Sequence, residues 1–281
     1  MLLDLVSPWA AAVEATDPAR ACAAFRRRHA PLLDALRRQR APLDTTLALA
    51  TDRLDLDRYA AAAADAGVQQ EVRDVLARAA EHGALVAPAA LLASAAAGDS
   101  VEALVDPATI AVLVNCVSAE EPVTVAVARA AAAVTRWTAA DSASPLRRTP
   151  GEIWDRWLLA RTVPLSEWLY TEGIGVHLAA ALHPGLPPRH LLGVPRGAYH
   201  RLRERERALR ALLAGDLERA GVDLVLRWLL PAARSALPAS AGPADDGRSA
   251  IPAMAGRYLA WRMTAERVTR VGLEQAMRMA A

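Results

Sequence analysis

Lysine is absent from this sequence, and every one of its 33 basic residues is an arginine. A chain without lysine cannot form a lysine Schiff base or use a lysine-dependent phosphate loop. Its arginine and alanine usage is typical of a GC-rich bacterial genome. Aromatic residues are also scarce, at 4%, although 53% of the residues are hydrophobic. Alanine, leucine and valine therefore supply the core, and alanine-rich cores pack closely spaced helices, which predicts a mainly α fold.

Signals for disulfides, secretion and membrane insertion are lacking as well. The two cysteines, Cys22 and Cys116, lie far apart and are expected to be small buried hydrophobes rather than a disulfide. No apolar stretch approaches the roughly 20 residues of a membrane span without a charge or a proline. Asp4 and Glu14 interrupt the start of the chain, where a secretory signal needs a clean apolar run. We therefore expect a cytoplasmic protein with no membrane partner, and the net charge of +2 predicts no nucleic-acid partner.

The pattern of helix starts and stops divides the chain into two regions. Residues 1–105 are predicted to form a helical N-terminal region, and residues 106–281 a second domain packed against it as one compact unit. β-Branched runs at 108–116 and 122–128 predict a short strand pair, followed by a helix at 129–137. The predicted architecture is therefore mainly α, or α+β with a very small β element.

Helices dominate the rest of the prediction. A polar, proline-bearing loop is expected at 138–151, and residues 236–252 are expected to form a mobile loop that is a candidate lid. The expected helices are 68–82, 88–97, 151–160, 164–183, 196–214, 221–230 and 251–271, with a short one from Leu273.

The segment WLYTEGIGVHLAAALHPG, residues 168–185, places a glutamate among apolar helix positions. At about 100° per residue, Glu172 falls on a side of the helix made of large apolar groups. A carboxylate there is partly desolvated, so it must find a partner, bind a cation or carry a raised pKa. An ordinary buried ion pair or hydrogen bond, for example to Arg262 or Tyr258, is one alternative. His177 lies on a different side of the helix, roughly opposite Glu172.

The same segment resembles a helix of predicted zinc-dependent proteases of the gluzincin kind. In those proteins one helix carries HExxH, and the glutamate of a later "EG" helix supplies the third zinc ligand. LLGVPRGAYHRLRERERALRALLAGDLE resembles the charged helix that follows in that family, and IPAMAGRYLAWRMTAERVTRVGLEQAMRM resembles its closing pattern. The resemblance covers about residues 164–279. It implies a zincin-like helical domain with Glu172 at the position of the third ligand.

No HExxH motif exists anywhere in the 281 residues. In the register that the resemblance implies, Ala132, Ala133 and Arg136 stand where two zinc ligands and the general base would be. Alanine can neither bind zinc nor move a proton. The chain also lacks a GxSxG elbow, a CxxC pair and a Gly-rich phosphate loop. We therefore expect no metal and no cofactor.

These features predict a metal-independent small-molecule tailoring enzyme of bacterial specialised metabolism. It would carry out an elimination or a ring closure on an amine-bearing, anionic substrate in the zincin-like groove. Glu172 is expected to act as general base or acid, with a pKa raised by Trp168 and Leu165. Tyr258 is expected to orient the substrate or to donate to a developing oxyanion. The candidate substrate-binding residues are Arg262, Arg136, Trp168, His177 and Asp155.

Two other functions are left open. A non-catalytic pseudo-metalloprotease would use the groove to bind a peptide, a small ligand or a partner subunit, or would form a homodimer, with Glu172 as a structural leftover. A zinc hydrolase would instead combine Glu172 with His177, His183 or His190 as non-standard ligands. Replacement of Glu172 by glutamine separates catalysis from binding, because it abolishes turnover by a folded protein only if Glu172 moves a proton.

Overall fold

The computed structural model describes residues 2–40, 61, 65–85, 89–91, 101–106, 109–114, 122–148, 155–229, 251–252 and 254–281. Most of these residues are helical, so the predicted mainly α fold is confirmed. The N-terminal elements are β1 (Leu2–Asp4), α1 (Val6–Val13), α2 (Pro18–Arg28), α3 (Ala30–Arg40), α5 (Ala66–Glu81), β2 (Ala89–Leu91) and β3 (Val101–Asp106). They are followed by β4 (Thr109–Val114), α6 (Val123–Thr138), α7 (Arg156–Thr162), α8 (Leu165–Leu182), α9 (Pro188–Leu191), α10 (Arg196–Glu204), α11 (Glu206–Ala214), α12 (Val222–Trp228), α14 (Ala255–Val271) and α15 (Leu273–Arg278).

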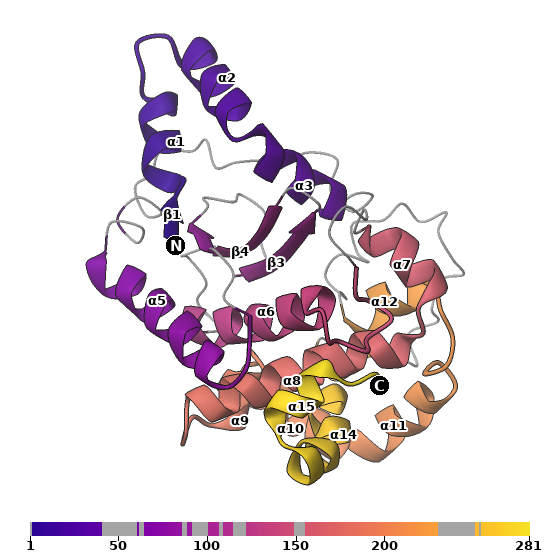
Figure 1. Cartoon of the computed structure of the whole chain (residues 1–281). Helices are drawn as coiled ribbons and strands as arrows, with labels where there is room; N and C mark the ends of the chain where they lie inside the picture. Colours follow the sequence, from indigo (N-terminus) through magenta and orange to yellow (C-terminus); the bar gives the residue numbers. More distant parts are fainter. Residues whose placement is uncertain are drawn as a thin grey trace.

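A four-stranded sheet stands between α3 and α6 (Figure 1). Its strand order is β1-β2-β4-β3. The pairs β1–β2 and β2–β4 are parallel, whereas β3 and β4 form an antiparallel hairpin in which Asp106 pairs with Thr109. Strands from both sides of residue 105 therefore share one sheet, and the two regions predicted from the sequence are joined through it.

Two strand and helix predictions in this part of the chain are wrong. Residues 123–128 belong to α6 rather than to a strand, and β4 pairs with β3 instead. Val125 and Val127 of α6 are completely buried. Their packing between the sheet and α8 stabilises the helix and outweighs the preference of valine for strands. The helix expected at 88–97 contains β2 at Ala89–Leu91, and its remaining residues lie outside the described part of the chain.

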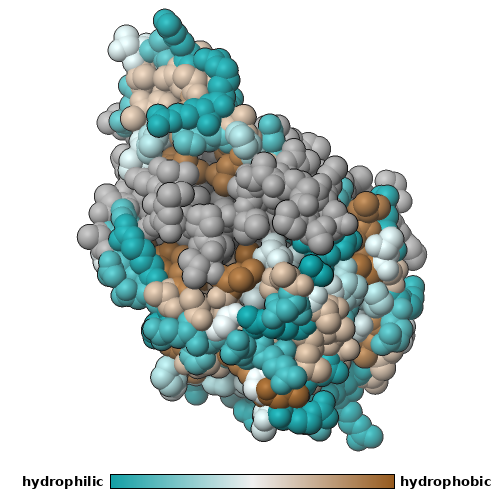
Figure 2. Space-filling view, viewed as in Figure 1, coloured by the Kyte–Doolittle hydropathy of each residue, from teal (hydrophilic) through white to brown (hydrophobic). Residues whose placement is uncertain are grey.

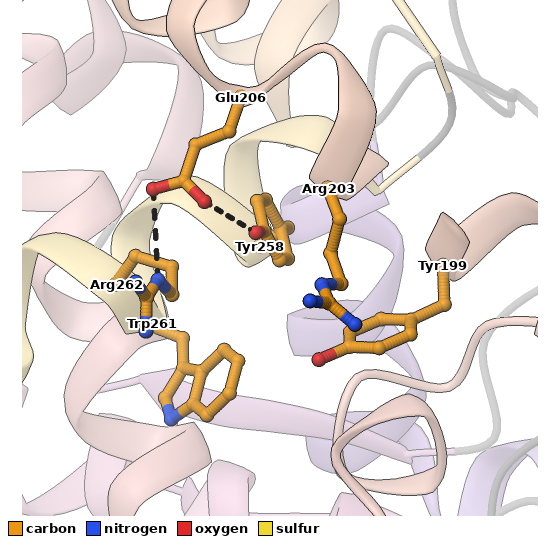
Figure 3. Close-up of a pocket in the computed structure, with 6 residues that line it drawn as sticks. All are labelled: Tyr199, Arg203, Glu206, Tyr258, Trp261 and Arg262. Atoms are coloured by element: carbon orange, nitrogen blue, oxygen red, sulfur yellow. Dashed lines mark hydrogen bonds and ion pairs between the residues drawn. The ribbon is translucent and has the colours of Figure 1, made fainter. Parts of the chain in front are cut away.

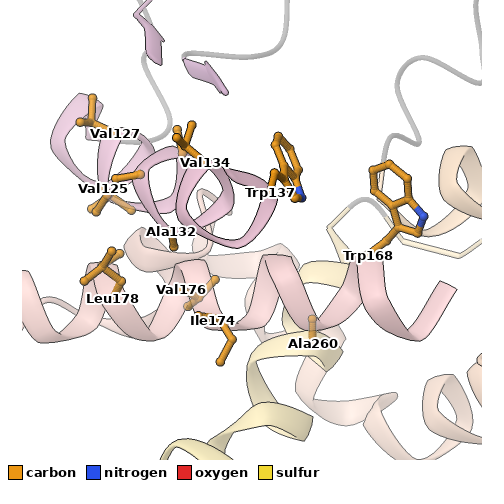
Figure 4. Packing of buried hydrophobic residues seen from close by; sticks show 14 of the residues in the cluster. Val125, Val127, Ala132, Val134, Trp137, Trp168, Ile174, Val176, Leu178 and Ala260 are labelled. Atoms are coloured by element: carbon orange, nitrogen blue, oxygen red, sulfur yellow. The ribbon is translucent and has the colours of Figure 1, made fainter. Parts of the chain in front are cut away.

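Helix α8 is the centre of the C-terminal part, with α6 packed along one side and α14 along another. Figure 4 shows the interface: Ala132 points from α6 toward α8, whereas Val134 points away from it. Ile174 and Val176 of α8 are completely buried in the same cluster. The small side chains of α6 permit this close approach, as expected for an alanine-rich core.

Two glycines of α8 allow neighbouring helices to come close. A methyl group on Gly173 would collide with the carbonyl oxygen of Ala260 in α14. On Gly175 it would lie only 3.1 Å from the Cβ of Arg129 in α6. The two glycines of the EGIG segment thus allow α14 and α6 to pack closely on two faces of α8. This packing role was not predicted from the sequence.

Most of the predicted C-terminal helices are confirmed with small shifts at their ends, whereas the helix expected at 151–160 begins only at Arg156. The helix expected at 196–214 is divided into α10 and α11 near Arg205, and the long closing helix starts at Ala255. The polar segment before α7 has no helix or strand in its described residues, 139–148. The candidate lid at 236–252 lies almost entirely outside the described residues, as does Cys116, while Cys22 is a half-buried free thiol.

Hydrophilic side chains cover much of the face seen in Figure 2, including the outer side of α5. Large hydrophobic side chains that are exposed are scattered over separate elements: Leu85, Leu158, Leu212 and Met263. None of the helices in the described part of the chain combines the length and the apolar character needed to cross a lipid bilayer.

Candidate functional site

Helices α10, α11 and α14 enclose a partly open pocket of about 350 Å³. This volume is at the lower end of the range typical of small-molecule sites. Figure 3 shows the side chains that line it, which are Tyr199, Arg203, Glu206, Tyr258, Trp261 and Arg262. Tyr258 and Arg262, four residues apart on one face of α14, were both predicted as site residues, and the structure brings them together.

Tyr258 forms the buried wall of the pocket and is bonded to Glu206. Its hydroxyl donates a hydrogen bond to Glu206 Oε2 at 2.6 Å, and only 2% of the residue is exposed. Burial and the neighbouring Glu206 carboxylate raise the pKa of Tyr258 well above its ordinary value. The phenol is therefore protonated at physiological pH and acts as a hydrogen-bond donor.

Glu206 is ionised because its hydrogen bonds and neighbouring charges outweigh its burial. Burial alone raises the pKa of this carboxyl, but hydrogen bonds from Tyr258 and Arg210 and the charge of Arg262 lower it, and the net direction is downward. Arg210 donates to Oε1 from Nε at 3.0 Å and from Nη2 at 2.9 Å. Glu206 and Arg210, four residues apart in α11, thus form an ion pair on the helix surface, and Glu206 also faces the pocket.

Arg262 and Arg203 bring positive charge to opposite sides of the pocket (Figure 3). Arg262 Nε lies 3.5 Å from Glu206 Oε1, and the side chain is 48% exposed. Its guanidinium carbon lies 5.9 Å from the centroid of the Trp261 ring. Arg203 is exposed on α10. The lining side chains therefore carry two guanidinium groups and one carboxylate, which makes the pocket attractive to an anion.

His177 supports the pocket from behind. Its Nε2 lies 3.0 Å from the backbone carbonyl oxygen of Trp261, which can only accept, so this nitrogen carries the proton. Burial lowers the pKa of His177, with the hydrogen bond to Trp261 working in the opposite direction. The predicted substrate-binding residue His177 thus holds the backbone beside Trp261 and does not line the pocket.

Glu172 lies outside this pocket and is paired with Arg257 of α14, which was not predicted as its partner. Arg257 Nε lies 3.2 Å from Glu172 Oε2, and 34% of the glutamate side chain is exposed. Burial raises the pKa of Glu172, but the charges of Arg257, Arg129 and Arg156 outweigh it, and the net pKa is lowered. The predicted raised pKa is therefore wrong, because three guanidinium groups stand near a carboxylate that is not fully desolvated.

Arg136 is completely buried and bound entirely within the protein. Its Nη2 lies 2.9 Å from Glu167 Oε2, and its Nε donates to Thr171 Oγ1 at 3.0 Å. Nη1 donates to the backbone carbonyl of Met279 at 2.6 Å. Burial lowers the pKa of Arg136 to about 10, although Glu167 and Tyr170 raise it. The substrate-binding role predicted for Arg136 does not fit this position, because no ligand reaches a side chain with 0% exposure.

Asp155 and Trp168, the other two predicted substrate-binding residues, have structural roles instead. Asp155 caps the N-terminus of α7, and its Oδ1 accepts hydrogen bonds from the backbone N–H groups of Trp157 and Leu158 at 2.8 and 3.1 Å. Trp168 is 5% exposed and belongs to the hydrophobic core. Neither residue lines the pocket.

Among the described residues, no group of three or more histidine, cysteine, aspartate or glutamate side chains is placed to hold a metal ion. The alternative set of Glu172 with His177, His183 or His190 falls within these residues and does not come together. Alanine is found where the resemblance puts zinc ligands, and Ala132 is completely buried.

Three lining residues, Tyr199, Arg203 and Glu206, were missed as site residues. They lie in the charged segment 201–210 or just before it, and the arginines of that segment are exposed. A signal was present, however: Tyr199 and Arg203 have the same ring-to-arginine spacing as Tyr258 and Arg262. Residues four apart share a helix face, so the repeated spacing indicates two similar faces that can meet.

No protein-family model, curated protein or solved structure matches this chain. The choice of the pocket as the candidate site therefore depends on its geometry and charge.

Proposed function

We propose that this protein binds a small anionic molecule in the pocket of α10, α11 and α14, and that it acts on this molecule without a metal. The observation that carries the proposal is the lining itself. Two guanidinium groups, three aromatic rings and one ionised carboxylate face a single pocket of about 350 Å³. Small-molecule sites combine aromatic side chains with a few precisely placed polar groups, and in this pocket the charged groups make up much of the lining.

Tailoring chemistry, an elimination or a ring closure in bacterial specialised metabolism, is the reaction that we propose for this pocket. Glu206 would be the proton acceptor, since it is ionised and lines the pocket, whereas Glu172 does not. An amine on the substrate would face the Glu206 carboxylate, and an anionic group would face Arg262. The protonated hydroxyl of Tyr258 would hold Glu206 in place through its 2.6 Å hydrogen bond.

A non-catalytic role is the second candidate, favoured by one observation. Both oxygens of Glu206 already accept hydrogen bonds, from Tyr258 and from Arg210, which weakens the carboxylate as a base. In this case the zincin-like chain would be a pseudo-metalloprotease that binds a small ligand. For both candidate functions we propose a cytoplasmic location, a partner subunit or a second copy of the chain as protein partner, and no nucleic-acid partner.

A thermal-shift screen of small anionic metabolites tests the proposal. We expect at least one compound to stabilise the wild type and the Arg270→Gln control, but not Arg262→Gln. Arg270 is an exposed arginine on the same helix that does not line the pocket. If no compound distinguishes Arg262→Gln from Arg270→Gln, the pocket is not the ligand site.

Turnover then separates the two candidate functions. A stabilising compound is incubated with chelator-treated protein, and its products are followed by mass spectrometry. An enzyme converts the compound, loses this activity in Glu206→Gln and keeps it in Glu172→Gln. A binding protein leaves the compound unchanged. Turnover that depends on added zinc, with stoichiometric zinc found by plasma mass spectrometry, would contradict the metal-independent proposal.

A further inference from the structure

The two walls of the pocket are built alike. In α10, Tyr199 is followed four residues later by Arg203, and in α14, Tyr258 is followed four residues later by Arg262. Each helix therefore presents a ring and a guanidinium group on one face. Trp261 adds a second ring on the α14 side. A molecule between the walls meets aromatic surface and positive charge on both sides.

Three aromatic rings line the pocket, and two of them flank the third. Tyr258 packs edge-on against Tyr199, with centroids 6.1 Å apart and planes at 79°, and against Trp261, with centroids 6.3 Å apart and planes at 63°. Tyr258 is buried, whereas Tyr199 and Trp261 are half-buried and flank it. Figure 3 shows the rings of Tyr199 and Trp261 on opposite sides of the pocket. Aromatic side chains favour stacked or edge-to-face contact with another ring.

The charges of the pocket bind the acidic group of the proposed substrate more strongly than its amine. Glu206 is engaged at Oε1 by Arg210 and at Oε2 by Tyr258, so an ammonium group would have to compete for it. Arg262 faces Glu206 through Nε, at 3.5 Å, and its side chain is nearly half exposed. Its remaining N–H groups can bind a carboxylate in the bidentate geometry that guanidinium groups prefer.

We infer that the ligand of this pocket is a small acid with a flat, aromatic ring, whose ring lies between Tyr199 and Trp261 and whose anionic group lies between Arg203 and Arg262. This inference rests on the proposed function, because it narrows the ligand class of the same pocket. In this arrangement Glu206 keeps its proposed role as proton acceptor, and Tyr258 is a positioning residue that holds the Glu206 carboxylate. The rings of Tyr199 and Trp261 and the two arginines select the ligand.

Isothermal titration calorimetry with three matched probes tests the inference. Phenylacetate carries a flat ring and an acid, cyclohexylacetate a puckered ring and the same acid, and phenethylamine a flat ring and a positive charge. We expect phenylacetate to bind about five- to tenfold more tightly than cyclohexylacetate, from aromatic contact. Phenethylamine is expected to bind more weakly than either acid.

Substitutions test whether the arginines select the acidic group and the aromatic residues select the flat ring. Arg262→Gln is expected to weaken phenylacetate binding about tenfold, whereas Arg201→Gln and Arg270→Gln, which remove exposed arginines outside the lining, leave it unchanged. Trp261→Leu is expected to remove the preference for the flat ring. Tyr199→Leu, at a half-buried position, is expected to remove the same preference. It replaces Trp261→Leu in the test if circular dichroism shows that Trp261→Leu does not fold.

Each contrary result has its own meaning. Equal binding of the two acids, lost in Arg262→Gln, overturns the ring preference and leaves the anion pocket intact. Tighter binding of phenethylamine than of phenylacetate overturns the preference for an acid. If none of the three probes binds at millimolar concentration, the aromatic-acid inference is overturned, and the metabolite screen still decides whether the pocket binds another anion.

Discussion

Glu172 illustrates how much one residue's function depends on its surroundings. The sequence placed this carboxylate on an apolar helix face, and its position in α8 was predicted correctly. The three arginines around it come from α6, α7 and α14, and none of them belongs to α8 itself. Helical periodicity reports the neighbours within one helix, so the partners that lower the pKa of Glu172 could not be predicted.

Replacement of Glu172 by glutamine is expected to lower the free energy of unfolding by about 0.5–1 kcal/mol at pH 7, as for other partly exposed ion pairs. The pKa of Glu172 is lower in the folded protein than its ordinary value of 4.5. The ionised carboxylate therefore stabilises the folded protein fully above pH 4.5, and this stabilisation is lost as the pH falls through the lowered pKa. Urea unfolding at pH 7 and at lower pH measures this. A difference between wild type and Glu172→Gln that grows below pH 4.5 would contradict the ion pair with Arg257.

At the scale of helices, the close approach of α8 and α14 depends on Gly173. Replacement of this glycine by alanine is expected to destabilise the protein by about 1–3 kcal/mol, because the methyl group meets the carbonyl of Ala260 and the two helices must separate. Gly215→Ala is the control, since nothing lies within 4 Å of the added carbon there. Chemical denaturation that ranks the two variants equally would show that the helices adjust at no cost.

A buried ion pair connects α6 to α8 and to the segment after α15. Glu167 accepts from Arg136 at 2.9 Å and from the backbone N–H of Ala281 at 2.5 Å. Glu167→Ala is expected to destabilise the protein by about 3–5 kcal/mol, because it leaves the Arg136 charge buried without its partner.

A paired replacement tests the reason for that loss. Arg136→Met combined with Glu167→Met removes both charges and is expected to cost less than Glu167→Ala alone. Thermal unfolding of the three proteins gives the order. A paired variant that is less stable than Glu167→Ala would mean that the hydrogen bonds of Arg136 to Thr171 and Met279 outweigh the buried charge.

Helices were predicted better than strands, for reasons visible in the chain. Pro164 and Gly185 mark the two ends of α8, and Gly272 separates α14 from α15, and these signals are local. The valine-rich start of α6 has strand composition, and its helical state depends on packing between the sheet and α8. The pocket could be predicted in part: Tyr258 and Arg262 share one helix face, whereas their meeting with α10 and α11 is tertiary.

For the molecule as a whole, three histidines with lowered pKa values determine how stability changes in mild acid. Burial lowers the pKa of His29, His177 and His183 below the ordinary value of 6.5. The unfolded chain therefore binds more protons than the folded chain, and stability falls as the pH drops through 6.5.

The melting temperature is expected to decrease between pH 7.5 and 5.5, and less steeply in His177→Gln than in the wild type. The exposed His200 provides the control variant, His200→Gln, which should keep the wild-type slope. Identical slopes in all three proteins would show that His177 binds a proton as readily in the folded protein as in the unfolded chain.

The enclosure of α8 between α6 and α14 also affects how binding can be observed. Its amides are shielded by helices on several sides, so hydrogen exchange there requires opening of the whole C-terminal part and should be the slowest in the chain. Helix α10 lies at the periphery, and its amides should exchange through local opening. A ligand in the pocket would slow exchange first in α10 and α11, while a change in overall stability would be detected in α8. Exchange mass spectrometry of these helices thus distinguishes occupation of the pocket from general stabilisation in one experiment.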